Sequence, residues 1–467
     1  MKSEGSTKTD EMALEEYYNY FNHNVKTTMV KPSAVTDHPA MLAPSYLDHL
    51  HMDRYVPLLF LYRLVDKSDD VYNQFVATLK DSLAKTVVSF YPAAGAIVKT
   101  SNPNHPRMFL CDDRGVPFTE ACKDEAMDDV VNQDAFSPVP PLQGWEAAGL
   151  MPHNQCHPVG DSGSPGIVIQ VTRFNCGGVA LGFSWNHLLA DMTGAMLILR
   201  AWSDIATTGH TTIVPQLDRT VLNPRHEVEE TEPIAPPPMS EEEKAKLQTV
   251  LNTKFTSKVF RFKREKLAKL KQQAVQDVSD LSTMDCVSAH LWRCLSRYYA
   301  NFGITDKTIF STAVEGRKRM PGTLTTHFFG NVIVPAFVRN VPTSEILARP
   351  LSYAAGLIRK AHQAVEQETF FTIIDQMDLA NPWKTSINRT DHQVGLTSWI
   401  RFGIFDLEFG QGAPLFCMVN MLAQISRKGQ CICIPSKPGD GYCDILLYLA
   451  PHALEYLAAD PEFTSVI

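Results

Sequence analysis

Apolar residues recur along this chain at two different spacings. A spacing of three or four residues predicts four amphipathic helices, over 71–90, 192–206, 282–300 and 351–365. Alternating or continuous apolar runs predict four strands, over 308–316, 330–338, 430–436 and 443–451. Residues 165–186 indicate two further strands joined by the turn Asn175-Cys176-Gly177-Gly178. Because strands and helices interleave in both halves, the pattern predicts an α/β protein with two domains of mixed sheets.

The clearest change in composition is the proline- and glutamate-rich segment PRHEVEETEPIAPPPMSEEEKAK, residues 224–246. Proline stiffens an extended chain and like charges repel each other, so we expect an exposed linker here. The sequence therefore predicts an N-terminal domain over 1–210, a crossover linker over 211–246 and a C-terminal domain over 247–467.

Composition and charge exclude several classes of protein. The chain has 467 residues, of which 44% are apolar and 20% charged, which is typical of soluble globular domains and not of disordered or coiled-coil chains. A net charge of −8 excludes the basic surface of a nucleic-acid or anionic-membrane binder. No apolar run reaches about 18 residues, and the polar, acidic start resembles neither a secretory signal nor a transit peptide. We expect a cytoplasmic enzyme without membrane insertion.

The ten cysteines are scattered and contain no CxxC pair. Cys431 and Cys433 lie two residues apart in a predicted strand, which puts both on one face. We expect reduced, buried thiols. His153, Cys156 and His157 are of ligand type, but no complementary Cys/His pair lies close in sequence, so we predict no metal site.

The pattern HxxxD begins at His49, His157 and His187. With fifteen histidines, composition alone gives about one such match, so context must separate the three. His157 lies among prolines with no rigid element nearby, and His49 and His51 alternate with apolar residues as in an extended segment. His187 differs because it directly follows the apolar strand VALGFSW and directly precedes an apolar helix.

A strand end is a rigid platform from which a side chain can reach a ligand. Histidine has an ordinary pKa near 6.5, so there it could take a proton from a hydroxyl or amine and return it. A buried histidine with satisfied hydrogen bonds is the alternative interpretation of His187. Other enzyme classes lose their main support, because the chain has no GxSxG elbow, no P-loop, no GxGxxG after a strand and no HExxH.

The chain resembles the BAHD acyltransferase family of plants. His187 and Asp191, in SWNHLLADM, match the family's HxxxD, and EFGQGAP stands where the family has DFGWGxP. In the latter, Gly410 and Gly412 suit a tight loop after Glu408. Further stretches resemble the family in order, nearly from end to end: PSYLDHL, LKDSLAKTVVSFYPAAGAI, PQLDRTVL, STMDCVSAHLWRC, VEGRKRM with FFGNVI, LSYAAGLIRKA and TSWIRF.

The resemblance implies two similar-sized domains like chloramphenicol acetyltransferase, with a crossover loop and a channel between them. It implies transfer of an acyl group from acyl-CoA, as co-substrate, to a hydroxyl or amine of a small molecule, without a metal. The implied general base is His187. Asp191 is implied to turn away from it and to hold the geometry of the site through an arginine. We expect a monomer.

Further site residues follow from the resemblance. Thr397 and Trp399, in TSW, resemble acyl-pocket residues of hydroxycinnamoyl-using members, and their O–H and N–H could bind the oxyanion. Thr283 and Arg317 lie in stretches that line the CoA side of the family. A helix cap and a surface arginine are the alternatives for these two. The acidic residue of the second motif, Glu408, is implied to pair with Arg317.

The sequence departs from the family pattern at four positions. Met192 follows the motif's aspartate where glycine is usual, Glu408 and Gln411 replace Asp and Trp of DFGWG, and Ala96 replaces an arginine. These departures leave a second interpretation open, namely a catalytically silent relative that acts as an accessory or interaction protein. The acceptor, and whether oxygen or nitrogen is acylated, stay open.

Overall fold

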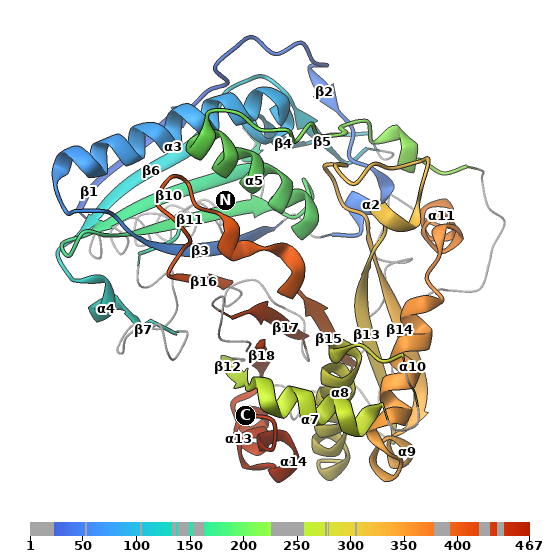
Figure 1. Cartoon of the computed structure of the whole chain (residues 1–467). Helices are drawn as coiled ribbons and strands as arrows, with labels where there is room; N and C mark the ends of the chain where they lie inside the picture. The colour runs from blue at the N-terminus through green and yellow to red at the C-terminus, as the bar shows by residue number, and fades with distance from the viewer. Residues whose placement is uncertain are drawn as a thin grey trace, which may run out of the picture. The chain divides into compact units, whose positions relative to one another are not determined.

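The structure is a computed structural model of the whole chain. It describes residues 23–51, 54–102, 105–132, 137–138, 149–152, 163–225, 256–275, 278, 280–303, 306–377, 393–419, 430–436 and 443–467. The chain divides into two compact units (Figure 1). The first consists of Met1–Arg219, His327–Asn331 and Gly403–Gln424, and the second of Thr220–Thr326, Val332–Phe402 and Ile425–Ile467. Most of the expected linker, from residue 226 onward, lies outside the described residues, so its boundaries stay a prediction.

A six-stranded mixed sheet forms the centre of the first unit. Its order is β1 (His23–Val30), β6 (Val116–Lys123), β10 (Ile167–Phe174), β11 (Gly178–Asn186), β3 (Tyr55–Arg63) and β16 (Phe416–Val419). β10 runs parallel to β6, and the other neighbours are antiparallel. β16 therefore brings a late segment of the chain onto the edge of an early sheet. A four-stranded sheet has the order β2 (Met41–Leu42), β5 (Arg107–Leu110), β4 (Ala96–Lys99) and β9 (Ser164–Pro165). A two-stranded sheet pairs β7 (Val131–Asn132) with β8 (Ser137–Pro138).

Two long helices of the first unit, α3 (Asp69–Ser89) and α5 (Met192–Thr208), lie side by side along its sheet (Figure 1). The buried indole of Trp202 on α5 donates to the Leu79 carbonyl and to Ser82 Oγ on α3, each at 3.0 Å. These two bonds satisfy the only polar atom of a large apolar side chain and fix the spacing of the helices. The short helices α2 (Tyr46–His49) and α4 (Met127–Val130) and the 3-10 turns Tyr91–Ala94 and Ile404–Asp406 complete the unit.

The second unit has its own six-stranded mixed sheet. Its order is β12 (Thr256–Phe262), β18 (Cys443–Leu449), β17 (Gln430–Pro435), β15 (Gln393–Ser398), β13 (Lys307–Glu315) and β14 (Ile333–Pro342). β15 runs parallel to both of its neighbours. The helices of this unit are α7 (Arg264–Ala274), α8 (Thr283–Asn301), α9 (Thr343–Ala348), α10 (Leu351–Gln363), α11 (Gln367–Asp375), α13 (Pro451–Ala459) and α14 (Pro461–Thr464). Short 3-10 turns span Thr220–Leu222, Arg317–Arg319 and Ile400–Phe402.

The predicted α/β class with mixed sheets is confirmed, and so are the four predicted helices and the predicted hairpin. α8 begins where a capping box predicts, because Ser282 and Asp285 bond to each other's backbone N–H. The predicted strand 330–338 begins later, at Ile333, and continues to Pro342. None of the helices in the described part of the chain is both long and apolar enough to cross a membrane.

The expectation of reduced cysteines is wrong for one pair. Cys433 and Cys443 form a disulfide, with their Cα atoms 6.6 Å apart. The antiparallel register of β17 and β18 sets Cys443 opposite Pro435, so Cys433 is its diagonal neighbour across the hairpin. The pattern within CICI could not show this, because the partner lies on the next strand. Cys431 is a free, buried thiol, and burial raises its pKa to about 12.

Candidate active site

His187 lies where the central strand β11 ends and the turn to α5 begins. Its backbone N–H donates to the Arg54 carbonyl at 2.7 Å, which ties this corner to the start of β3. The Asn186 side chain accepts from the N–H of Leu188 at 3.0 Å, and the N–H of Leu189 returns to the Asn186 carbonyl. These bonds hold the turn between strand and helix, and the His187 ring is half-buried. The predicted position of His187, between the end of a strand and the start of a helix, is confirmed.

The edge of the His187 ring meets a side chain that is distant in sequence. His187 Nδ1 is 3.1 Å from Asn331 Oδ1. The Asn331 amide nitrogen donates to Asp48 Oδ1 at 2.7 Å and to the His187 carbonyl at 2.9 Å, so its oxygen must face the ring. An amide oxygen only accepts, and His187 Nδ1 therefore carries the proton. In a neutral ring Nε2 then holds the lone pair, which is the form that a general base needs.

Asp48 holds Asn331 in this orientation. Its carboxylate is fully buried and accepts from Ser45 N–H at 2.7 Å, Ser45 Oγ at 2.9 Å and Asn331 N–H at 2.8 Å. Arg219, only 2% exposed, forms an ion pair with Asp48, and its other terminal nitrogen donates to the Leu189 carbonyl at 2.9 Å. Buried charges are tolerated when they are paired and hydrogen-bonded in this way. The two charges thus link α2 to the turn that carries His187.

Sequence reasoning assigned no role to Asp48, Arg219 or Asn331. All three lie in stretches that carried the family resemblance, PSYLDHL, PQLDRTVL and FFGNVI. The expectation that His49 and His51 lie in an extended segment is wrong for His49, the last residue of α2. Ser45 and Asp48 form a capping box that starts this short helix, and S-x-x-D was the sequence signal for it.

Asp191 is the N-cap of α5. Its side chain is buried and accepts from Gly194 N–H at 2.8 Å. Met192 is the first helical residue, so no positive φ is needed where the family has glycine. The expected structural role of Asp191 therefore has a local basis in the cap, and its expected arginine partner stays a prediction.

Asp191→Ala is expected to destabilise the protein by about 1 kcal/mol, because the cap of α5 is lost, and to lower activity with it. Asp191→Asn should retain most of the stability, since asparagine caps as well as aspartate. Urea unfolding of both variants measures this. If the Asn variant were as damaged as the Ala variant, the charge of Asp191 and not its cap would be the stabilising feature.

The second motif, EFGQGAP, packs within the first unit. The backbone N–H groups of Glu408 and Phe409 both donate to Ser203 Oγ on α5, at 2.9 and 3.2 Å. The Phe409 ring is fully buried and meets Trp202 and Tyr62 edge-on. This differs from the expectation that the motif belongs to the C-terminal domain. The reason is that Phe409 finds its apolar partners on α5 and β3.

The glycines of the motif have the predicted use. Gly410 has φ +78° and Gly412 φ +77°, where a side chain would be strained. Gly410 N–H donates to Thr207 Oγ1 on α5 at 3.0 Å. The loop is therefore held by backbone bonds and one aromatic anchor, and neither the Glu408 nor the Gln411 side chain is needed for these contacts.

Ser203→Ala is expected to destabilise the protein by about 1–3 kcal/mol, because two backbone N–H groups lose a buried acceptor. Thr207→Ala is the matched control, since its single bond is exposed and water can replace the hydroxyl. Denaturant midpoints compare the two. Equal losses, or none at Ser203, would show that the hydroxyl does not anchor the motif.

The remaining candidates lie in the second unit. Arg317 is 3% exposed and forms an ion pair with Glu315, Nη1 to Oε1 at 2.9 Å, and is therefore not a surface arginine. Thr283 is the exposed first residue of α8, and the cap is Ser282. Neither a CoA contact nor the Glu408–Arg317 pair is tested by these observations.

Thr397 and Trp399 lie at and just beyond the end of β15. Thr397 is half-buried and stands opposite Ile432 in the parallel register of β15 with β17. Trp399 is 5% exposed, and its backbone N–H donates to the Cys433 carbonyl at 2.7 Å. The end of this interior strand fixes the backbone of both residues, as donors to a developing charge would require. Their role stays a prediction.

A cluster of metal-ligand type also lies in the second unit. Atoms of His290, Cys294 and Glu462 lie within 4.8 Å of one another. However, Glu462 forms ion pairs with Arg293, at 3.0 Å, and with Arg297. Burial lowers the pKa of His290 to about 4 and raises that of the Cys294 thiol above its usual range. Two cations at the carboxylate and a protonated thiol do not suit a metal ion.

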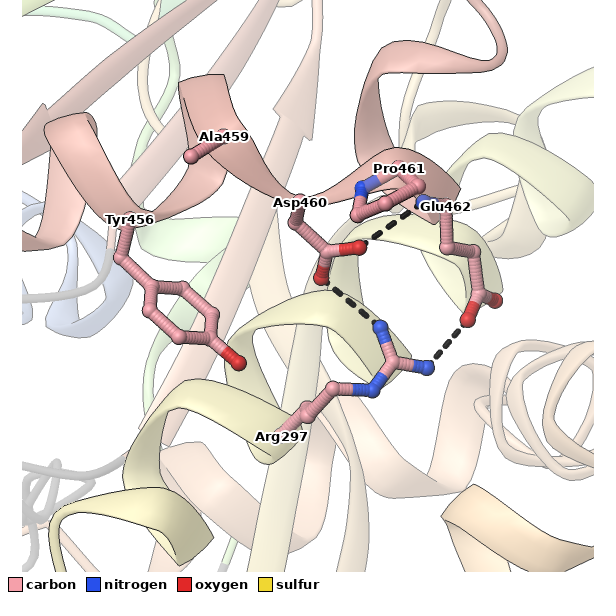
Figure 2. A pocket seen from close by; sticks show the side chains of 6 residues that line it. All are labelled: Arg297, Tyr456, Ala459, Asp460, Pro461 and Glu462. Carbon is pink, nitrogen blue, oxygen red and sulfur yellow. Dashed lines mark hydrogen bonds and ion pairs between the residues drawn. The ribbon is translucent and has the colours of Figure 1, made fainter.

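A pocket of about 470 Å³ shares Glu462 with this cluster. Figure 2 shows the side chains that line the pocket. The lining residues are Arg297, Tyr456, Ala459, Asp460, Pro461 and Glu462. Arg297 reaches between the two carboxylates and bonds to both, so the charges inside are already paired (Figure 2). The predicted site residues do not line this pocket. The residues 153–162, with a further HxxxD, lie outside the described residues.

Comparisons with known proteins agree on one family. The profile of the Transferase family matches residues 23–464. A hydroxycinnamoyltransferase of Narcissus pseudonarcissus is 30% identical over 454 residues, covering 93% of this chain and 98% of that protein. A hydroxycinnamoyl-CoA:5-hydroxyanthranilate N-hydroxycinnamoyltransferase of Avena sativa is 29% identical, covering 92% and 96%. The structure of vinorine synthase matches with a TM-score of 0.71 at 23% identity over 95% and 97% of the chains. That of F. sporotrichioides TRI101 with coenzyme A and T-2 matches with 0.70 at 20% over 91% and 98%.

The family profile and the curated relatives thus define an acyltransferase. The chain belongs to the Transferase family, which is the BAHD family of the sequence resemblance. It is an acyl-CoA-dependent O- or N-acyltransferase by class, and its co-substrate is an acyl-CoA.

Proposed function

We propose that this protein transfers an aromatic acyl group, such as hydroxycinnamoyl, from CoA to a hydroxyl or amine of a small molecule, with His187 as general base. The observation that carries the proposal is the contact of His187 Nδ1 with Asn331 Oδ1, which puts the ring proton on Nδ1 and leaves the basic lone pair of a neutral ring on Nε2. We further propose a monomer in the cytoplasm.

The step balances as follows. His187 Nε2 takes the proton of the acceptor O–H or N–H while the acceptor atom bonds to the thioester carbonyl carbon. The carbonyl becomes an oxyanion, which Thr397 Oγ1 and the Trp399 indole N–H are suited to bind. When the carbonyl re-forms, the C–S bond breaks and the CoA thiolate takes the proton from His187. Free CoA and the ester or amide are the products.

The aromatic donor is supported by two observations. The curated relatives named above are hydroxycinnamoyltransferases. This chain has the TSW sequence at Thr397–Trp399, with the tryptophan buried just beyond the end of β15. Thr283 and Arg317 are proposed to contact CoA, because both lie in stretches that resemble the CoA side of the family.

The alternative of a catalytically silent relative has one observation in its favour, the altered second motif with Glu408 and Gln411. The contacts described for that loop reduce its weight, because they use backbone N–H groups and Phe409. A panel of acyl-CoAs and acceptors, with free CoA followed by a thiol reagent, separates the two. CoA release that requires an acceptor supports the enzyme. No release from any pair, with donors that do stabilise the fold thermally, supports the silent relative.

A further inference from the structure

A second imidazole lies against the proposed base. The rings of His51 and His187 stack with their centroids 4.3 Å apart and an angle of 3° between their planes. We propose that His51 is a positioning residue that fixes the plane of the His187 ring and disfavours its protonation in mildly acidic solution. This inference rests on the proposed role of His187 as general base.

The two supports of the His187 ring originate from one helical turn. The Asp48 carboxylate orients Asn331, which holds the ring at Nδ1. The Asp48 carbonyl accepts from His51 N–H at 3.0 Å, which fixes the backbone from which the second ring projects. The edge and the face of His187 are thus both set by Asp48, one contact through the carboxylate and one through the backbone.

Stacking restricts the torsion that an edge contact leaves free. A single hydrogen bond at Nδ1 fixes one ring atom, but the ring can still tilt about that contact. A parallel ring at van der Waals distance removes this tilt and keeps Nε2 pointing in one direction. Orientation of a catalytic group within about 10–20° is what productive proton transfer requires.

The same geometry couples the charges of the two rings. Two imidazolium ions at this distance repel each other by the equivalent of about 0.7 pH unit even with the dielectric constant of water, and by more in a half-buried site. The pair therefore accepts its second proton only at a lower pH than it would without this repulsion. With one proton bound, His187 is neutral whenever His51 carries it.

The other charged groups around the pair do not remove this coupling. Asp48 is neutralised by its ion pair with Arg219. Burial lowers the pKa of His49 to about 4, so His49 stays neutral in mildly acidic solution. Arg54 meets His187 through its backbone carbonyl, which accepts from His187 N–H and carries no net charge.

Two variants separate positioning from charge. His51→Phe keeps a flat ring but cannot be protonated, and His51→Asn is polar but cannot stack. Both should move the acid limb of the kcat/KM profile upward by about 0.3 pH unit or more, because His187 then titrates alone. Only His51→Asn should also lower kcat on the alkaline plateau. Desolvation of His187 by the apolar Phe ring would by itself lower the pKa of His187 and move the acid limb to lower pH. An upward shift in His51→Phe therefore cannot come from desolvation.

His38→Phe is the matched control. His38 also stacks, on Tyr91 at 4.5 Å, and contacts Asp113 and not His187. This variant should leave the pH profile unchanged.

A measurement without turnover distinguishes this inference from the proposed function. NMR titration of ¹³C-labelled histidines reports the pKa of His187 in the free protein. An upward shift in both His51 variants supports the coupling even if no substrate has been found. An unchanged His187 titration in His51→Phe and His51→Asn, together with unchanged kcat in both, would overturn the inference, whatever the activity assay shows.

Discussion

Replacing His187 with alanine is expected to lower kcat by about 10²- to 10⁴-fold, the usual contribution of a general base. The acceptor then keeps its proton and attacks the thioester as a neutral, weak nucleophile. Binding of the acyl-CoA should change little, because the proposed contact of Nε2 is with the acceptor and not with the donor. Steady-state kinetics and calorimetric titration of the donor measure the two effects separately.

His210→Ala is a suitable control for this variant, since His210 is exposed just beyond the end of α5. It should keep wild-type kcat. Retention of more than a tenth of wild-type kcat in His187→Ala would refute the role of the imidazole. Loss of donor binding together with kcat would indicate a structural role instead.

The second large effect is expected at Asp48. Asp48→Ala should destabilise the protein by about 3–5 kcal/mol, because the buried guanidinium of Arg219 loses its counter-ion. Asn331 loses the acceptor of its amide and backbone N–H groups as well. The orientation of His187 should therefore fail in whatever folded fraction remains.

An exposed pair gives the matched control. Asp81 and Lys85 form an i,i+4 ion pair on α3, in which the Asp81 side chain is 65% exposed. Asp81→Ala should change the free energy of unfolding by less than about 0.5 kcal/mol. The double variant Asp48→Ala with Arg219→Met should cost clearly less than the sum of the two single changes. Additive losses in urea unfolding would show that the two charges do not stabilise each other.

The local elements of the fold could be predicted because their signals are local. The hairpin β10–β11 follows from apolar runs around Asn175–Gly178, and Gly177 adopts the positive φ that its turn needs. His187 was identified by the abrupt change from strand to helix spacing on either side of it. Both signals lie within about twenty residues of sequence.

The supports of His187 could not be predicted in this way. Asn331 lies 144 residues after His187 and 283 after Asp48, and Arg219 lies 171 after Asp48. No periodicity connects such residues, and a single buried Asp or Arg has no pattern of its own. The stack of His51 on His187 was missed because SYLDHLHMD was interpreted as alternation, whereas a capping box starts a helix there.

The second motif illustrates the same limit. Its two glycines predict a tight loop correctly, but the sequence places the loop after most of the second unit's strands. The structure packs it on α5, because Phe409 is buried against Trp202 and Tyr62. Domain membership depends on such long-range apolar contacts and not on order along the chain.

The most direct test of acyl transfer by this protein is the stoichiometry of its products. Purified protein is incubated with a hydroxycinnamoyl-CoA and a panel of hydroxyl and amine acceptors, and mass spectrometry quantifies the acylated acceptor alongside free CoA. We expect equal amounts of both, formed only when an acceptor is present and nearly absent with His187→Ala. Release of CoA without an acylated acceptor, or equal product from His187→Ala, would contradict acyl transfer by this histidine.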